Sequence, residues 1–198
     1  MKRLNPKIIQ LIGDAVIPLL GFFWWNWSLY FIVLFYLLDY LSNEVILNLK
    51  SKKITTFQEI DSKIWIKKAS LSFLLFLLGI VLVHLSMKML HPQIDFYKEF
   101  IQFLSYKDMG MAQGYFLLPL IALVGYQRYK MEFLMPARFK TLTIPTLWAS
   151  HFKMQFTLIG CVAFTIGFQS LIALPETVYI IGIVVVTSVY QLLERKGY

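Results

Sequence analysis

The sequence predicts an all-α fold, a polytopic transmembrane bundle of six spans. Three observations support this prediction. Of the 198 residues, 58% are hydrophobic and only 15% are charged, whereas about a quarter of the residues of a soluble domain are charged. The apolar residues gather in six stretches, and short polar connections separate these stretches. Nearly all Lys and Arg residues fall in alternate connections, as expected of a chain that crosses a membrane repeatedly.

A membrane-crossing helix needs about 17 to 25 residues, and the first, fourth and sixth of the six stretches are short by this measure. The six stretches cover residues 8–23, 28–47, 69–90, 111–126, 144–170 and 178–193. We expect residues 1–198 to form a single transmembrane helical domain from these spans.

The first two stretches could instead form one helix, because residues 8–38 are almost unbroken; the bundle would then have five spans. The basic residues favour two spans. Basic groups both before this stretch and after it, at residues 50–53, prefer the cytoplasmic side. The predicted turn lies at Trp24–Trp27, where indoles suit the headgroup region and Asn26 favours a turn.

The distribution of basic residues also predicts the orientation. Of the 19 Lys and Arg residues, 16 fall on one side, and only Lys88, Lys98 and Lys107 remain on the other. Both termini should therefore be cytoplasmic, with anionic lipid beside the basic connections. A nucleic-acid partner is not predicted, because it would require a basic face on a water-exposed module.

Two polar connections are predicted to begin or contain helices. In residues 93–107, apolar residues recur with helical spacing from Tyr97 to Leu104, which predicts an interfacial helix. On the other side, Thr56 and Glu59 resemble a capping box that would start the helix of the third span.

Polar residues at membrane depth are the candidate functional residues, because a charge there costs between about 2.5 and more than 10 kcal/mol. Asp14 is followed by Pro18 at i+4 and Gly21 at i+7 on the same helix face. Two interpretations remain open. Asp14 is a proton or cation site at a weakened helix, or it is a carboxyl group bonded to a neighbouring helix.

The second span ends in a polar wedge that contains Asp39, Asn43 and Glu44. Together with Asp14 these carboxylates could converge near the inner surface. Their candidate partners are Arg138, His151 and Lys153, at or just before the fifth span. A buried ion-pair network that stabilises the bundle explains this pattern, and so does a proton relay.

No cofactor or metal is predicted, because the sequence has one cysteine and lacks clustered His and carboxylate ligands. Phosphate-binding loops and nucleophile motifs are also missing, so an enzyme is not favoured. Small residues recur at heptad spacing, which predicts faces for close helix contact. They are Ser72, Gly79 and Ser86 in the third span, and Gly160 and Gly167 in the fifth.

The stretch GDAVIPLLGFFWWNWSLYFIVLFYLLDY resembles the opening of an uncharacterised family of bacterial integral membrane proteins, a domain of unknown function. The matching residues are Pro18, Gly21, Trp27, Tyr36 and Asp39, and Arg138 followed by His151 is similar to that family's second half. Tyr40 stands where the family has Asn. The resemblance implies a shared fold in the bacterial inner membrane and draws attention to Asp39, Arg138 and His151, without implying an activity.

Three functional hypotheses follow, and the least favoured is an enzyme that acts on a lipid or quinone at the inner interface through His151 and nearby carboxylates. The first is a non-catalytic subunit or accessory factor that contacts another membrane protein or a second copy of itself. The alternative is a small proton- or cation-coupled transporter that uses Asp14, Asp39 and Glu44.

Overall fold

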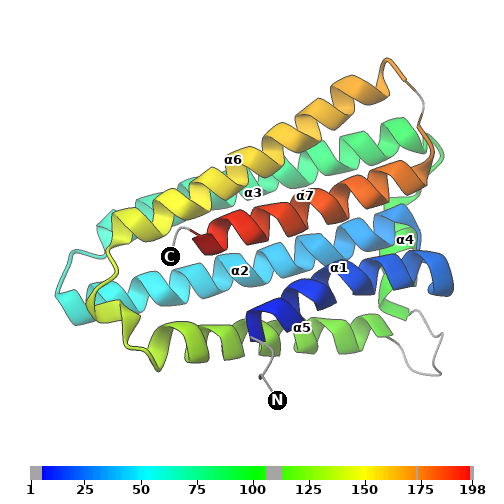
Figure 1. The fold of residues 1–198 in the computed structure, drawn as a ribbon. Helices are drawn as coiled ribbons and strands as arrows, with labels where there is room; N and C mark the ends of the chain where they lie inside the picture. The colour runs from blue at the N-terminus through cyan, green and yellow to red at the C-terminus, as the bar shows by residue number, and fades with distance from the viewer. Residues whose placement is uncertain (1–5, 106–112, 173, 197–198) are drawn as a thin grey trace. The chain divides into compact units, whose positions relative to one another are not determined.

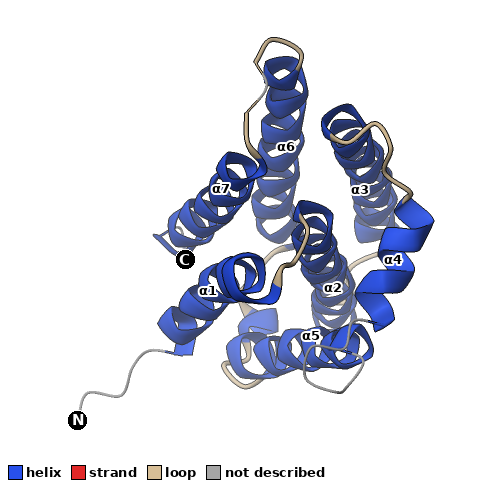
Figure 2. Cartoon of the chain, turned by 90° about the vertical axis from the view of Figure 1, so that its right-hand side faces the viewer, coloured by secondary structure: helices blue, strands red, loops and turns tan. Residues whose placement is uncertain are grey.

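A computed structural model describes residues 6–105, 113–172 and 174–196, and all regular secondary structure in these ranges is helical (Figure 1; Figure 2). This confirms the predicted all-α class. The elements are α1 (Pro6–Trp25), α2 (Leu29–Gln58), α3 (Lys63–Leu90), α4 (Phe96–Ser105), α5 (Gln113–Tyr129), the π-helix η1 (Lys130–Leu134), the 3₁₀ helix η2 (Arg138–Lys140), α6 (Ile144–Gln169) and α7 (Glu176–Lys196).

Three of the described helices, α2, α3 and α6, are long and apolar enough to cross a membrane. Their most apolar 18-residue windows have mean hydropathies of 1.5, 2.3 and 1.2 respectively. Shorter apolar helical segments lie at Ala15–Trp25 and Glu176–Ser188. The number of six spans stays a prediction.

The chain divides into two compact units, which are described separately. Unit 1 consists of Met1–Phe35 and Leu171–Tyr198, and unit 2 consists of Tyr36–Ser170. In unit 1, α1 packs against α7. In unit 2, α3 and α6 pack along each other and run in the same direction, while α2 and α5 run the opposite way (Figure 1).

The chain turns between α1 and α2, where the Trp-rich segment predicts a turn. Asn26 adopts a left-handed conformation with φ of 51°, which Asn tolerates better than most residues. The N–H of Trp27 donates to the carbonyl of Gly21 at 2.9 Å. The indoles differ in exposure, because Trp24 is 73% exposed whereas Trp27 is 3% exposed. Trp27 is therefore a packing residue of unit 1.

The predicted capping box at Thr56 and Glu59 is wrong, because α2 continues through Thr56 and ends at Gln58. The Thr56 hydroxyl donates to the carbonyl of Lys52 inside the helix at 2.8 Å. Glu59 has a φ of 54° and therefore stops α2 instead of starting α3. The second half of α2 becomes hydrophilic before the helix ends. The polar residues therefore do not mark the end of the helix.

Helix α4 lies within residues 93–107, where the sequence predicts an interfacial helix, although residues 106–107 fall outside the described ranges. The Asp95 carboxylate accepts from the N–H groups of Tyr97 and Lys98 at 3.1 and 3.2 Å, which caps the first turn. Phe103 is fully buried, whereas Tyr97 is exposed. The location of α4 at a membrane interface stays a prediction.

The hydrophobic core of unit 2 lies where the second half of α2 meets η1 and the start of α6. Trp148 is fully buried there with Ile54 and Phe133. Farther along α3 and α6, the Ser86 hydroxyl donates to the Gln169 side chain at 3.0 Å. These contacts fix the rotation of α6 against α2 and α3.

Candidate functional site

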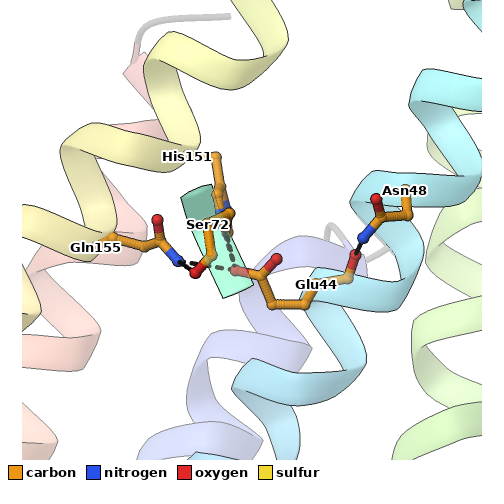
Figure 3. Close-up of polar contacts among 5 residues, drawn as sticks. All are labelled: Glu44, Asn48, Ser72, His151 and Gln155. Atoms are coloured by element: carbon orange, nitrogen blue, oxygen red, sulfur yellow. Dashed lines mark hydrogen bonds and ion pairs between the residues drawn. The ribbon is translucent and has the colours of Figure 1, made fainter. Parts of the chain in front are cut away.

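Glu44 is the centre of a buried polar cluster within unit 2. It projects from α2 toward Ser72 of α3 and toward His151 and Gln155 of α6 (Figure 3). His151 and Gln155 share one face of α6 because they are four residues apart. All four residues are buried, with exposed fractions of 6% for Glu44, 0% for Ser72, 7% for His151 and 2% for Gln155.

One carboxylate oxygen of Glu44 has three polar neighbours. Its Oε1 atom lies 2.6 Å from His151 Nε2, 2.8 Å from Ser72 Oγ and 2.9 Å from Gln155 Nε2. Ser72 Oγ also lies 2.9 Å from His151 Nε2, and Gln155 Nε2 donates to the Ser72 carbonyl at 2.9 Å. A deprotonated Glu44 can only accept, so in that state His151 carries hydrogen on Nε2. The cluster joins three helices through one oxygen atom.

Aromatic residues enclose the cluster. The ring of Tyr40 stacks on Phe76 at 5.3 Å and on the His151 imidazole at 6.0 Å, measured between centroids. On the other side, Trp148 meets His151 edge to face at 5.9 Å. The Trp148 indole donates to Ser51 Oγ at 3.0 Å, which ties α6 to α2 a second time. The cluster therefore lies in an apolar, aromatic surrounding, where its hydrogen bonds are strong.

The geometry differs from that of a Ser-His-acid catalytic triad. In a triad, the acid binds one imidazole nitrogen and the serine binds the other. Here Ser72 and Glu44 both contact Nε2 of His151. Ser72 is also fully buried, so its hydroxyl is not accessible to a substrate. The arrangement suits joining helices or holding a proton between His151 and Glu44, and it does not suit nucleophilic catalysis.

Two of the candidate residues predicted from the sequence, Glu44 and His151, are in direct contact. Lys153 and Arg138, the other candidate partners, have exposed side chains, and they are not among the neighbours of the Glu44 carboxylate in the described residues. The Asp14 side chain lies outside the described residues, so its predicted convergence with the other carboxylates stays a prediction.

Asp39 and Asn43 belong to a second polar group. Asn43 Nδ2 donates to Asp39 Oδ2 at 3.2 Å, and Arg128 Nη1 of α5 donates to Asn43 Oδ1 at 3.3 Å. The predicted span at residues 111–126 leaves Arg128 in the following connection, although it lies in the last turn of α5. Gly125 lets α5 approach α2 here, because a Cβ atom at this position would lie 2.5 Å from Ser42 Oγ.

The sequence prediction did not assign Ser72 and Gln155 to the candidate site. Its heptad spacing with Gly79 and Ser86 predicts only a packing role for Ser72. Its hydroxyl lies within an apolar stretch, which was a usable signal because such a group needs a partner. Gln155 also had a signal, since it follows His151 at i+4 on one helix face.

Among the residues that the structure describes, no group of three His, Cys, Asp or Glu side chains could hold a metal ion. Comparison of the chain with protein-family models, with curated proteins and with solved structures found no match.

Proposed function

We propose that this chain is a six-span protein of the bacterial inner membrane, with both termini cytoplasmic, that acts as a non-catalytic subunit or accessory factor. It works through contacts between its helices and another membrane component, either a different protein or a second copy of the chain. The open apolar faces of α3 and α6 carry this proposal.

Helices α3 and α6 leave most of their apolar surface uncovered. In their most apolar windows only 17% and 11% of the residues are buried, compared with 44% in α2. A Cβ atom added at Gly79, Gly160 or Gly167 would meet no atom within 4 Å. Glycines on an open apolar face let a second helix approach closely in a membrane. Lipid alone would cover the surface equally well with larger residues at these positions.

The buried polar groups support the same proposal. Ser72 Oγ, His151 Nε2 and Gln155 Nε2 all contact Glu44, so these three polar atoms have a partner within the bundle. A cluster that joins α2, α3 and α6 produces a rigid scaffold whose outer faces remain for binding.

We expect the wild-type chain to purify from mild detergent or nanodiscs as a stoichiometric complex or a homo-oligomer. Gly160→Leu with Gly167→Leu should convert it to a monomer, because bulk on one face of α6 keeps a second backbone away. Mass measurement of the particle checks this. Gly182→Leu, at a glycine of α7 that also has open space around it, should leave the assembly intact. A wild-type monomer, or a double variant that still assembles, contradicts the proposal.

The alternative function is a small proton- or cation-coupled transporter that uses Asp14, Asp39 and Glu44. The contact of 2.6 Å between Glu44 and His151 favours it, because an ionisable pair at membrane depth is a candidate proton relay. The two side chains keep 8% and 7% of their surface accessible. The amide oxygen of Gln155 is buried without a hydrogen-bond partner among the described residues. It could accept a hydrogen bond from the group that carries the proton.

If the transporter hypothesis is correct, wild-type proteoliposomes should acidify inside when an inward proton gradient is imposed. Glu44→Gln and Asp14→Asn should each abolish this flux while expression stays normal, because the amide cannot exchange a proton. Glu59→Gln changes an exposed carboxylate and should leave the flux unchanged. An encapsulated pH-sensitive dye measures the result. Wild-type liposomes that behave like empty ones rule out a proton-conducting form of this alternative.

A further inference from the structure

A group of rings and lysines lies at one end of unit 2, where α2 meets η1 and η2. Gln58 at the end of α2 donates to the carbonyls of Phe139 and Leu142 at 3.0 and 3.1 Å, which holds the η2 segment against α2. Phe139 packs edge to face on Phe57 at 5.0 Å and lies 6.2 Å from Phe133. We refer to Phe57, Phe133 and Phe139, with Lys53 and Lys140, as the basic aromatic platform.

The rings position the ammonium groups of the platform. Lys53 Nζ lies 5.2 Å from the centroid of the Phe139 ring, and Lys140 Nζ lies 6.0 Å from that of Phe57. These distances are within the range of cation–π attraction. Both lysines are exposed, and within the described part of the chain neither forms an ion pair with a carboxylate. Their charges are therefore available to an external anion.

The surrounding charge has the same sign. Residues 50–68 contain six lysines against two acidic residues, and residues 128–140 contain four basic residues against one acidic residue. At the other end of unit 2, residues 86–105 contain two lysines and two acidic residues. Because the excess of positive charge is confined to the platform end, attraction of an anion there is local and not a property of the whole surface.

The location of the platform indicates which anion it binds. Two of the three helices that are long enough to cross a membrane, α2 and α6, end or begin beside the platform, at Gln58 and Ile144. Exposed apolar side chains accompany the lysines, since Phe57 is 49% exposed and Met135 is 64% exposed. A surface that binds an acidic protein or nucleic acid in water has no need of these apolar groups beside membrane-length helices. A phospholipid presents both parts, a phosphate and an acyl chain.

We infer that the basic aromatic platform binds the headgroup phosphate of an anionic phospholipid. Lys53 and Lys140 contact the phosphate, and the exposed edge of Phe57 lies against the upper acyl chain. This inference requires only that α2 and α6 enter a membrane. It is independent of the partner proposed for the faces of α3 and α6.

Native mass spectrometry of the full chain, titrated with phosphatidylglycerol or phosphatidylcholine, tests the inference. We expect preferential retention of phosphatidylglycerol by the wild type. Lys53→Gln with Lys140→Gln should weaken its apparent affinity by about 30-fold, from the usual contribution of two basic groups at an anionic surface. Lys53→Arg with Lys140→Arg keeps the charges and should retain the lipid, which separates lost binding from a folding defect.

Lys88→Gln with Lys98→Gln is the matched control, because it removes two exposed lysines at the other end of unit 2. This control should bind phosphatidylglycerol like the wild type. Equal retention of the two lipids by the wild type would overturn the inference. An equal loss in the control variant would do the same, because it would indicate a net-charge effect. Displacement of the lipid by millimolar glycerol phosphate would identify a site for a free phosphate compound and would also overturn it.

Discussion

Glu44→Ala should lower the free energy of unfolding more than any other single substitution in the polar cluster, by about 2 to 5 kcal/mol. The lower limit assumes three hydrogen bonds of ordinary strength for a membrane protein, and the upper limit assumes the loss of one partner from a buried ion pair. The variant leaves His151, Ser72 and Gln155 without the oxygen that they share. Reversible unfolding in mixed micelles measures the change.

Lys153→Ala is the decisive control for this prediction. Lys153 follows His151 by two residues on α6, and its side chain is exposed, so the expected change is within about 0.5 kcal/mol. A loss at Lys153 that equals the loss at Glu44 would contradict the assignment of His151 as the partner. His151→Ala combined with Glu44→Ala should cost less than the sum of the two single variants, with a coupling of about 1 to 3 kcal/mol.

The comparison of Lys153 with His151 illustrates what sequence reasoning could not decide. Both residues were candidate partners because they lie at one depth of one helix and carry suitable chemistry. They point about 200° apart around a helix of 3.6 residues per turn, so only the rotation of α6 selects between them. That rotation depends on distant contacts, notably the burial of Trp148 against α2 with its bond to Ser51.

The same distinction between local and long-range information applies to the fold. The turn before α2 was predictable because Asn26 and its flanking indoles carry a local signal. The end of α2 was not predictable, because Thr56 and Glu59 resemble a local helix start whereas α2 continues to Gln58. Arg128 was missed for a related reason. Its charge suggested a connection, but α5 extends past it and directs it at Asn43.

Gly21→Ala should destabilise unit 1 by about 3 kcal/mol, near the upper end for overpacking in a core. A Cβ atom at this position would lie 2.2 Å from Cε3 and 2.4 Å from Cδ2 of the Trp27 indole. The indole cannot rotate away easily. It is 3% exposed and stacks on Phe31 with a centroid distance of 4.4 Å. The backbone cannot separate either without losing the hydrogen bond of 2.9 Å from Trp27 to Gly21.

Substitutions at two further glycines serve as controls for this measurement. Gly182→Ala should be neutral or stabilising by up to about 1 kcal/mol, because no atom lies within 4 Å of the added Cβ and alanine favours helix. Gly125→Ala should cost less than Gly21→Ala, because its closest neighbour is the Ser42 hydroxyl, a single atom that can rotate. If the steric argument is correct, replacing Trp27 with Leu should remove most of the cost of Gly21→Ala. An undiminished cost in that background would show that the close approach of Trp27 to α1 is not what requires glycine at this position.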